Sequence, residues 1–233
     1  MGRLMKRDRE ILKHIARYRL TTDDVLLQLF FEHTEYKNAI DRVMKRLARQ
    51  GWVRSYVYRG TEKYHMLGLK AARLLDAPHY PRPVTEQTLP ALIAILCYCV
   101  RYKVKRIEES GLAKEFASLC VPEFAGASYY ADRTIDPPRT RLHLIIVDRN
   151  NTIRRLNRVV SRAVVRRYRY ASFHDLIQKQ HFALTIVTTS ERRKQFIEKK
   201  IENESRLVPH RVRVVPDYAP LLGSDLSQQG HRR

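Results

Sequence analysis

Residues 34–67 of the chain read TEYKNAIDRVMKRLARQGWVRSYVYRGTEKYHML and combine a helical pattern with two strand patterns. Within Thr34–Gln50, apolar residues recur at the three- and four-residue spacings of one buried helix face. These residues are Ala39, Ile40, Val43, Met44 and Leu47. Gly51 follows, and glycine adopts the left-handed conformation that ends a helix at the lowest cost. The stretch therefore predicts an amphipathic helix that stops at Gly51.

Two runs rich in aromatic and β-branched residues follow this helix. They are Trp52–Tyr58 and Lys63–Leu67, with Arg59-Gly60-Thr61-Glu62 between them. Gly60 suits a tight turn, so the pattern predicts a β-hairpin. A basic helix followed by a basic two-stranded ribbon is typical of a winged helix-turn-helix, in which the helix enters the major groove and the wing contacts the backbone. The alternative is a solvated helix on some other small domain.

The flanking sequence supports the winged-helix interpretation. Amphipathic patterns predict helices over Lys6–Tyr18 and Asp23–Phe31, and Thr21 or Thr22 can cap the second of them. A further short helix is expected over Leu69–Leu75. We therefore expect residues 1–76 to form a winged helix-turn-helix DNA-binding domain.

A change of composition marks the end of this domain. Residues 76–83 hold three prolines, so residues 77–88 are expected to form a linker. A long helix is predicted from Gln87 to Glu109, and its first half is apolar on nearly every side. Such a helix needs extensive cover. We expect it to pack into the second domain and to mediate a homodimer through residues 89–109.

The remainder of the chain alternates strand and helix patterns. Strands are predicted over Arg139–Val147, Phe182–Thr188 and Arg211–Val215, with helices over Thr152–Tyr168 and from the cap Ser190 to Glu204. The alternation indicates an α/β domain with a mixed sheet over residues 89–222, followed by a polar tail, 223–233. The expected fold class is α+β, with a winged helix followed by this α/β domain.

Composition restricts the partners of the protein. The chain has 233 residues, a formal net charge of +21 and 44% hydrophobic residues, which is a globular composition with a large cationic excess. Such an excess indicates a polyanionic partner. No apolar run is long enough to span a membrane, and the N-terminus has no signal pattern, so we expect a cytoplasmic location and no membrane partner. Three cysteines give no disulfide framework and are expected to be buried.

Duplex DNA is the expected partner, with contacts from both domains. The candidates on the predicted recognition helix and hairpin are Tyr36, Lys37, Asn38, Arg42, Lys45, Arg46, Arg49, Arg54, Arg59 and Lys63. In the second domain, four arginines lie four residues apart on one helix face, and Arg side chains favour phosphate. They are Arg154, Arg158, Arg162 and Arg166. The alternative for these four is a solvated face neutralised by acids elsewhere in the fold.

Two carboxylates could support an enzymatic alternative. Glu123 follows Pro122, and Asp148 ends the strand pattern of residues 139–147. Together they could hold Mg²⁺ for phosphodiester hydrolysis. The Asp148-Arg149-Asn150 sequence offers no lysine to accompany them, which favours a structural role in which Asp148 caps a helix or pairs with an arginine. No other metal site, nucleophile pairing or phosphate-binding loop is visible, so no cofactor is expected outside the nuclease alternative.

Several motifs resemble the replication-relaxation family of plasmids and other mobile elements. They are Arg7–Leu12, Arg17–Thr22, the Arg42–Leu47 helix, Gly51 and the Lys63–Leu67 strand. The resemblance implies an N-terminal winged helix and a C-terminal domain like the PD-(D/E)XK nucleases, often degenerate. Glu123 and Asp148 match the acidic positions of the family, whereas the missing lysine and the arginine-rich helix depart from it. The resemblance implies replication control, mobilisation or transcriptional regulation.

These observations lead to one expectation and two alternatives. We expect a DNA-binding protein of a plasmid or mobile element that acts by sequence-directed duplex binding. The enzymatic alternative is a metal-dependent DNA nuclease that uses Glu123 and Asp148. The third is an RNA-binding scaffold, although the chain lacks the aromatic and glycine signatures of common RNA modules.

Overall fold

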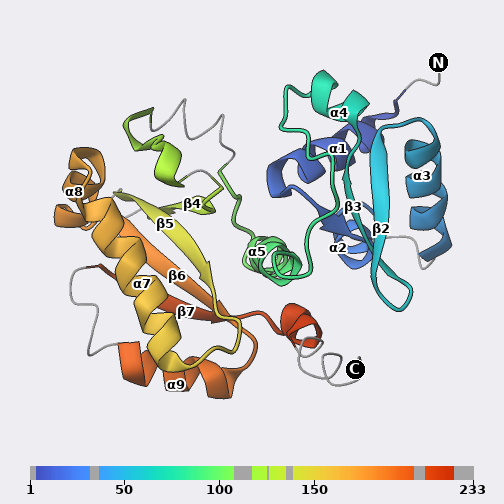
Figure 1. Ribbon diagram of the computed structural model, residues 1–233. Helices are drawn as coiled ribbons and strands as arrows, with labels where there is room; N and C mark the ends of the chain where they lie inside the picture. Colours follow the sequence, from blue (N-terminus) through green and yellow to red (C-terminus); the bar gives the residue numbers. More distant parts are fainter. Residues whose placement is uncertain are drawn as a thin grey trace, which may run out of the picture. The chain divides into compact units, whose positions relative to one another are not determined.

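The computed structural model describes residues 4–31, 37–107, 117–124, 126–134, 139–201 and 208–222 (Figure 1). Contacts divide the chain into two compact units, Met1–Leu96 and Cys97–Arg233. The division falls inside a helix, α5 (Leu89–Arg101), rather than in the proline-rich segment where the sequence analysis placed the boundary.

The first unit joins helices to a small antiparallel sheet. Its strands have the order β1-β3-β2, so the two-residue β1 pairs with the second strand of the hairpin. The predicted helices and hairpin are confirmed to within a few residues over the described ranges, whereas β1 was not predicted. The elements are α1 (Lys6–Tyr18), β1 (Thr21–Thr22), α2 (Asp23–Phe30), α3 (Lys37–Arg49), β2 (Val53–Arg59), β3 (Glu62–Leu67) and α4 (Leu69–Leu74).

One apolar cluster holds these elements together. The predicted apolar stripe of α3 is buried against α1, α2 and the base of the hairpin. Gly51 ends α3 with φ +75°, and the amide of Trp52 donates to the Leu47 carbonyl at 2.9 Å, as a Schellman helix end requires. The Thr22 hydroxyl accepts the amide of Val25 and caps α2, as predicted. These local signals fix where α2 begins and where α3 stops.

The proline-rich segment is not a free linker, because its residues 77–84 pack on the first unit. The Arg54 guanidinium donates to the carbonyl of Pro81 at 2.7 Å and also to the carbonyl of Tyr80. The Tyr80 ring in turn lies 3.9 Å from the Arg19 guanidinium. The amide of Val84 donates to the Tyr64 hydroxyl at 3.1 Å. The predicted linker of residues 77–88 is therefore attached to the first unit over residues 77–84.

Helix α5 is shorter than predicted. It ends at Arg101, and Lys103 adopts φ +53°. The Val104 amide donates to the Cys99 carbonyl at 3.0 Å, which closes the helix end. The expected continuation toward Glu109 is wrong as far as residue 107, and residues 108 and 109 lie outside the described ranges. Among the described residues of the predicted dimer segment 89–109, Tyr102 is the exposed large apolar side chain, and the homodimer stays a prediction.

The second unit is a four-stranded mixed sheet with helices. The strand order is β4-β5-β6-β7, with β4 antiparallel to β5 and the other neighbours parallel, which confirms the predicted mixed sheet. Strand β4 and helix α8 were not predicted. The elements are η1 (Ala117–Leu119), η2 (Pro122–Phe124), β4 (Tyr129–Thr134), β5 (Arg139–Val147), α7 (Ile153–Tyr168), α8 (Ala171–Gln178), β6 (Phe182–Thr188), α9 (Glu191–Ile201), β7 (His210–Val214) and η3 (Pro216–Leu221).

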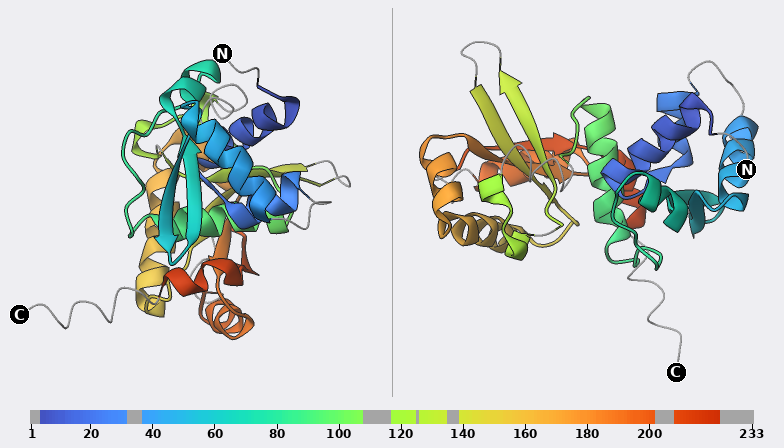
Figure 2. Two further views of the ribbon diagram at one scale, coloured as in Figure 1. Left: turned by 90° about the vertical axis from the view of Figure 1, so that its right-hand side faces the viewer. Right: turned by 90° about the horizontal axis from the view of Figure 1, so that it is seen from above.

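Helices α7, α8 and α9 pack against one face of this sheet through a single apolar cluster (Figure 1). Leu144, Ile146, Leu184 and Ile186 alternate along β5 and β6 and supply the sheet side of the cluster. The first part of β5 pairs with β4 alone, so these two strands continue as a ribbon past β6 (Figure 2). The other face of the sheet carries the buried polar residues His143 and Thr185 together with the buried apolar residues Ile145 and Val187.

A buried ion pair joins the carboxyl ends of β5 and β6 to α9. Asp148 is almost fully buried, and its two oxygens accept Nε and Nη2 of Arg193 at 2.8 and 3.2 Å. The Thr188 hydroxyl donates to the same carboxylate at 3.2 Å. The Tyr218 hydroxyl donates to the backbone carbonyl of Asp148 at 2.8 Å. The expectation that Asp148 pairs with an arginine is confirmed.

Removal of the cation from this pair should destabilise the second unit. Arg193→Met leaves the Asp148 carboxylate buried and uncompensated, so we expect a loss of about 3 kcal/mol in unfolding free energy. The neighbouring Arg192 is exposed. Arg192→Met should therefore change the free energy of unfolding by less than about 0.5 kcal/mol. Native-state hydrogen exchange of β6 amides measures both values. Equal effects of the two variants would contradict the assigned role.

Candidate nucleic-acid interface

The outer face of α3 presents a polar, basic stripe. Asn38, Arg42, Lys45 and Arg49 are spaced four, three and four residues apart, which places them on one side of the helix. All four are exposed, whereas Ile40, Val43, Met44 and Leu47 on the opposite side are buried. The side chains that could contact DNA are therefore separated from those that build the core.

Internal acids hold two of the other basic residues near this stripe. Asp41 accepts Lys63 at 3.1 Å and also Lys45 at 2.6 Å, which draws Lys63 toward α3. Arg46 donates to Asp8 of α1 at 2.7 Å, and the Asp8 side chain is fully buried. Arg46 is therefore a structural residue, in contrast to its predicted role as a DNA contact. Lys45 remains largely exposed and belongs to the stripe.

The remaining predicted contacts of the first unit have different outcomes. Arg54 faces the carbonyls of Tyr80 and Pro81, so its predicted phosphate contact is replaced by backbone hydrogen bonds. Arg59 is exposed at the end of β2, beside the irregular pairing between Val57 and Arg59. Tyr36 and the side chain of Lys37 lie outside the described part of the chain.

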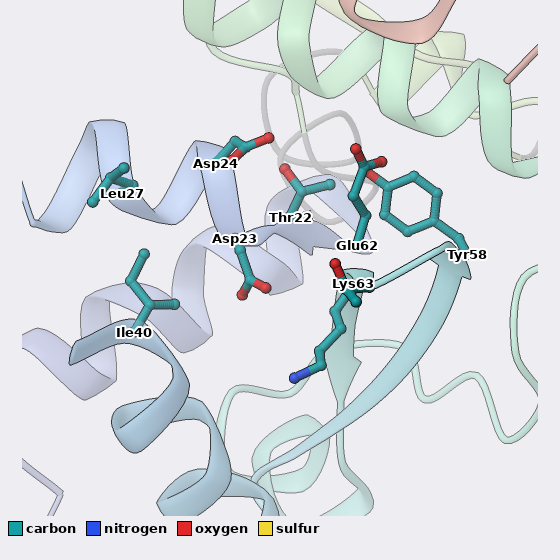
Figure 3. A pocket seen from close by; sticks show the side chains of 9 residues that line it. Thr22, Asp23, Asp24, Leu27, Ile40, Tyr58, Glu62 and Lys63 are labelled. Atoms are coloured by element: carbon teal, nitrogen blue, oxygen red, sulfur yellow. The ribbon is translucent and has the colours of Figure 1, made fainter. Parts of the chain in front are cut away.

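Acidic side chains gather in a pocket beside the β2–β3 hairpin. A pocket of about 140 Å³ lies between the start of α2, α3 and the hairpin, and Asp23, Asp24 and Glu62 line it (Figure 3). Nε2 of the buried His65 lies 2.7 Å from the Asp23 carboxylate. Its other ring nitrogen, Nδ1, lies 2.8 Å from the Ser55 hydroxyl. Three carboxylates against the single lysine Lys63 make this pocket unfavourable for phosphate, and Glu62 is also the cross-strand partner of Arg59.

The predicted arginine row of the second unit is on the surface of α7. Arg154, Arg158 and Arg162 are exposed, and none of them has an ion pair with a described residue. Arg166 is the exception, because its Nε lies 3.6 Å from Glu123. Among these four arginines, Arg166 is therefore the one whose charge is neutralised by a described acid of the fold.

Arg167, on the same helix, has a structural role. It is buried, donates to the Tyr129 hydroxyl at 2.7 Å and lies 4.2 Å from the centre of the Phe124 ring. Its position in the last turn of α7 also favours a positive charge. The number of arginines in the α7 sequence is therefore larger than the number of exposed positive charges on the helix.

The two carboxylates of the nuclease alternative lie at opposite ends of α7. Glu123 accepts the Tyr170 hydroxyl at 2.7 Å, just after the last turn of the helix. Asp148 is held by Arg193, which also donates to the Asn151 carbonyl beside the first turn. The helix has 16 residues and is about 24 Å long. The structure therefore does not bring Glu123 and Asp148 together, and the described residues contain no group of three potential metal ligands from His, Cys, Asp and Glu.

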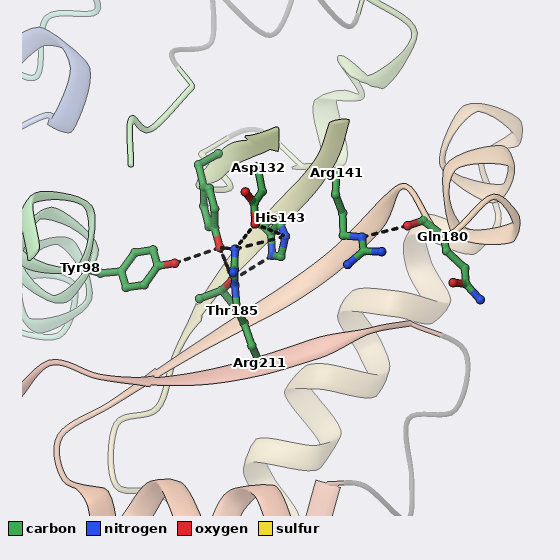
Figure 4. A network of polar contacts seen from close by, with 8 residues as sticks. Tyr98, Asp132, Arg141, His143, Gln180, Thr185 and Arg211 are labelled. Atoms are coloured by element: carbon green, nitrogen blue, oxygen red, sulfur yellow. Dashed lines mark hydrogen bonds and ion pairs between the residues drawn. The ribbon is translucent and has the colours of Figure 1, made fainter. Parts of the chain in front are cut away.

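A polar network crosses the sheet of the second unit on the face opposite α7 (Figure 4). The Arg211 guanidinium donates to Asp132 at 2.8 Å and to the Tyr130 hydroxyl. Tyr130 also meets the Thr185 hydroxyl at 2.7 Å and accepts the Tyr98 hydroxyl at 2.9 Å. Each of the four strands thus contributes at least one polar side chain, and that of β5 is His143. Sequence reasoning missed this network, because its members are isolated polar residues in separate strands.

His143 is the titratable centre of this network. Burial, together with the nearby Arg211 cation, lowers the pKa of His143 to about 3. Arg211 approaches Nε2 at 3.4 Å and can only donate, so Nδ1 carries the proton and donates to the Thr185 hydroxyl at 3.1 Å. The imidazole therefore remains neutral at physiological pH and serves as a hydrogen-bonding residue of the core.

Two further expectations concern cysteines and membranes. Cys99 is buried, and burial raises the pKa of its thiol to about 12. Cys120 is exposed, so the expectation that all three cysteines are buried is wrong.

Every helix in the described ranges is too short or too polar to cross a bilayer.

Comparison of the chain with protein-family models, with curated proteins and with solved structures finds no match.

The structural role of Arg46 can be separated from DNA binding by stability measurements. Arg46→Ala leaves the carboxylate of Asp8 buried without its cation, so we expect a loss of about 2–4 kcal/mol. The exposed Arg42 serves as control, and Arg42→Ala should change stability by less than about 0.5 kcal/mol. Urea unfolding followed by the fluorescence of Trp52, which lies in the same apolar cluster, reports both. A stable Arg46→Ala protein would disprove the assignment.

Acid should weaken the second unit through His143. Between pH 6.5 and about 3 the unfolded chain binds a proton at this position that the folded chain does not bind. The free energy of unfolding therefore falls as the pH decreases below 6.5, by up to about 1.4 kcal/mol for each pH unit. Hydrogen exchange of β6 amides at pH 7 and pH 5 measures the change. His143→Gln should reduce it, and an unchanged pH dependence in that variant would contradict the assignment.

Proposed function

We propose that the protein binds duplex DNA in a sequence-directed manner through its first unit, which acts as a winged helix-turn-helix. In this proposal α3 enters the major groove and the β2–β3 hairpin contacts the backbone beside it. The order of three helices and a hairpin, with the short β1 paired to β3, supports this arrangement.

The observation that carries the proposal is the exposed stripe of α3. Its four side chains include two arginines that can donate in pairs to guanine and an asparagine that can bind adenine. The apolar residues on the other side of the helix lie in the core or pack against it, whereas Arg42 and Arg49 of the stripe have no ion pair with a described residue. The net charge of +21 supports a polyanionic partner in general, whereas the stripe supports contact with base edges.

The biological setting follows from the sequence resemblance. A sequence-directed DNA-binding protein of a plasmid or mobile element would act in transcriptional regulation or in replication and mobilisation. Hydrolysis of DNA is not part of the proposal, because Glu123 and Asp148 are separated by the length of α7 and Asp148 is engaged by Arg193.

A binding selection tests the proposal. The full chain is mixed with sheared DNA of its own replicon and with random duplex at near-physiological salt. We expect enrichment of one short motif. The double variant Arg42→Gln, Arg49→Gln should lower the preference for that motif by about 10- to 100-fold for each base-reading arginine that is lost.

A matched variant controls for charge. Arg9→Gln, Arg73→Gln removes the same two charges from exposed positions of the first unit outside α3 and should keep the preference. Uniform recovery of all duplexes by the wild-type protein would overturn sequence-directed binding. Tighter binding of single-stranded RNA than of duplex DNA would instead favour the RNA-binding alternative.

A further inference from the structure

The surface of α7 in the second unit has an unusual composition. Its exposed residues are arginines, two valines and one serine, and the helix contains no acidic residue. Arg154, Arg155, Arg158 and Arg162 line an open hollow of about 630 Å³ together with Thr152 and Val159. A helix surface of one charge sign repels itself and costs stability unless an anion is present.

The geometry of the row indicates a long ligand. Arg154, Arg158 and Arg162 succeed one another at about 6 Å along the helix axis, since each residue rises 1.5 Å. A small anion would need side chains that converge in an enclosed pocket. A row over about 12 Å fits instead a polyanion whose charges repeat along a line, and guanidinium groups pair with phosphate in a fork-like geometry.

The chemistry of the row also indicates what it does not recognise. Among the exposed residues of α7 there is no amide or carboxylate that could distinguish one base edge from another. There is also no exposed aromatic residue on α7 on which an unpaired base could stack, as single-strand binding proteins require. Val159 and Val165 are about half exposed and can contact sugars, but they carry no hydrogen-bonding information.

We propose that the α7 arginine face binds the phosphate backbone of duplex DNA without reading its bases, an inference that rests on the proposed function for the identity of the polyanion. The protein then has two DNA contacts with separate tasks. The stripe of α3 determines which sequence is bound. The α7 arginine face adds affinity for any duplex, and this contribution depends on salt.

The test compares two triple variants of the full chain. Arg154→Gln, Arg158→Gln, Arg162→Gln removes the row. Arg192→Gln, Lys199→Gln, Lys200→Gln removes three exposed charges from α9 of the same unit and controls for net charge. All six side chains are exposed and have no ion pair with a described residue, so both variants should fold. The α7 variant should melt at or above the wild-type temperature, because the repulsion along its helix is relieved.

Binding is measured over a series of salt concentrations, for the motif-containing duplex and for random duplex. We expect the α7 variant to lose about 3 units from the slope of log K against log salt, because each phosphate contact contributes about 0.9. Its affinity should fall by the same factor for both duplexes, which leaves their ratio unchanged. The α9 variant should keep most of the wild-type slope.

Three results would overturn the inference. They are an unchanged slope in the α7 variant, equal losses in the two triple variants, and a fall in the ratio of the two affinities in the α7 variant. The preference of the wild-type protein for one motif tests the proposed function of α3 independently. If the wild-type protein shows no preference for any motif but the α7 variant still loses the slope, the role of α3 fails and the backbone contact of α7 stands.

Discussion

The small number of acidic residues governs which cations of this protein remain available. The chain has 45 lysines and arginines but only 24 aspartates and glutamates. Asp8, Asp132 and Asp148 each hold an arginine at 2.8 Å or less. Asp41 joins α3 to the hairpin through Lys63 and also pairs with Lys45 one turn further along α3. Most of these pairs connect elements that are far apart in sequence, so the acids act mainly inside each unit. Arg42 and Arg49 on α3 and Arg154, Arg158 and Arg162 on α7 have no ion pair with a described residue, and they lie on the surfaces proposed to meet DNA.

Much of the first unit could be predicted, because its signals are local. The apolar stripe of α3, the glycine after it and the aromatic strands each follow from a spacing or a residue type within a short window. Which cations contact ligand could not be predicted in the same way. Arg42 and Arg46 look alike in sequence, yet one is exposed and the other compensates the charge of Asp8, 38 residues earlier. That difference depends on a tertiary contact.

The helix ends show a second limit of prediction. Gly51 made the end of α3 predictable from the sequence. Residues that are not glycine adopt the same left-handed conformation, among them Arg19, Asp76, Lys103 and Gln180. Lys103 therefore ends α5 where the sequence favours its continuation. Strand β4 and the network around His143 were missed for a related reason. Their polar residues are compatible with a loop, and only pairing with β5 makes Asp132 and Tyr130 neighbours of Arg211.

The attachment of residues 77–84 to the first unit affects how the protein can be divided for experiments. The sequence suggests that a fragment could end at residue 76. Such a fragment would lose the two carbonyls that Arg54 binds at Tyr80 and Pro81. It would also lose the aromatic ring under Arg19 and the amide that Tyr64 accepts. In such a fragment water would replace the two carbonyls at Arg54, and the Tyr64 hydroxyl would lose its contact with residue 84. A useful expression boundary therefore lies beyond Val84, and proteases should find few cleavage sites in this segment although it forms no helix or strand.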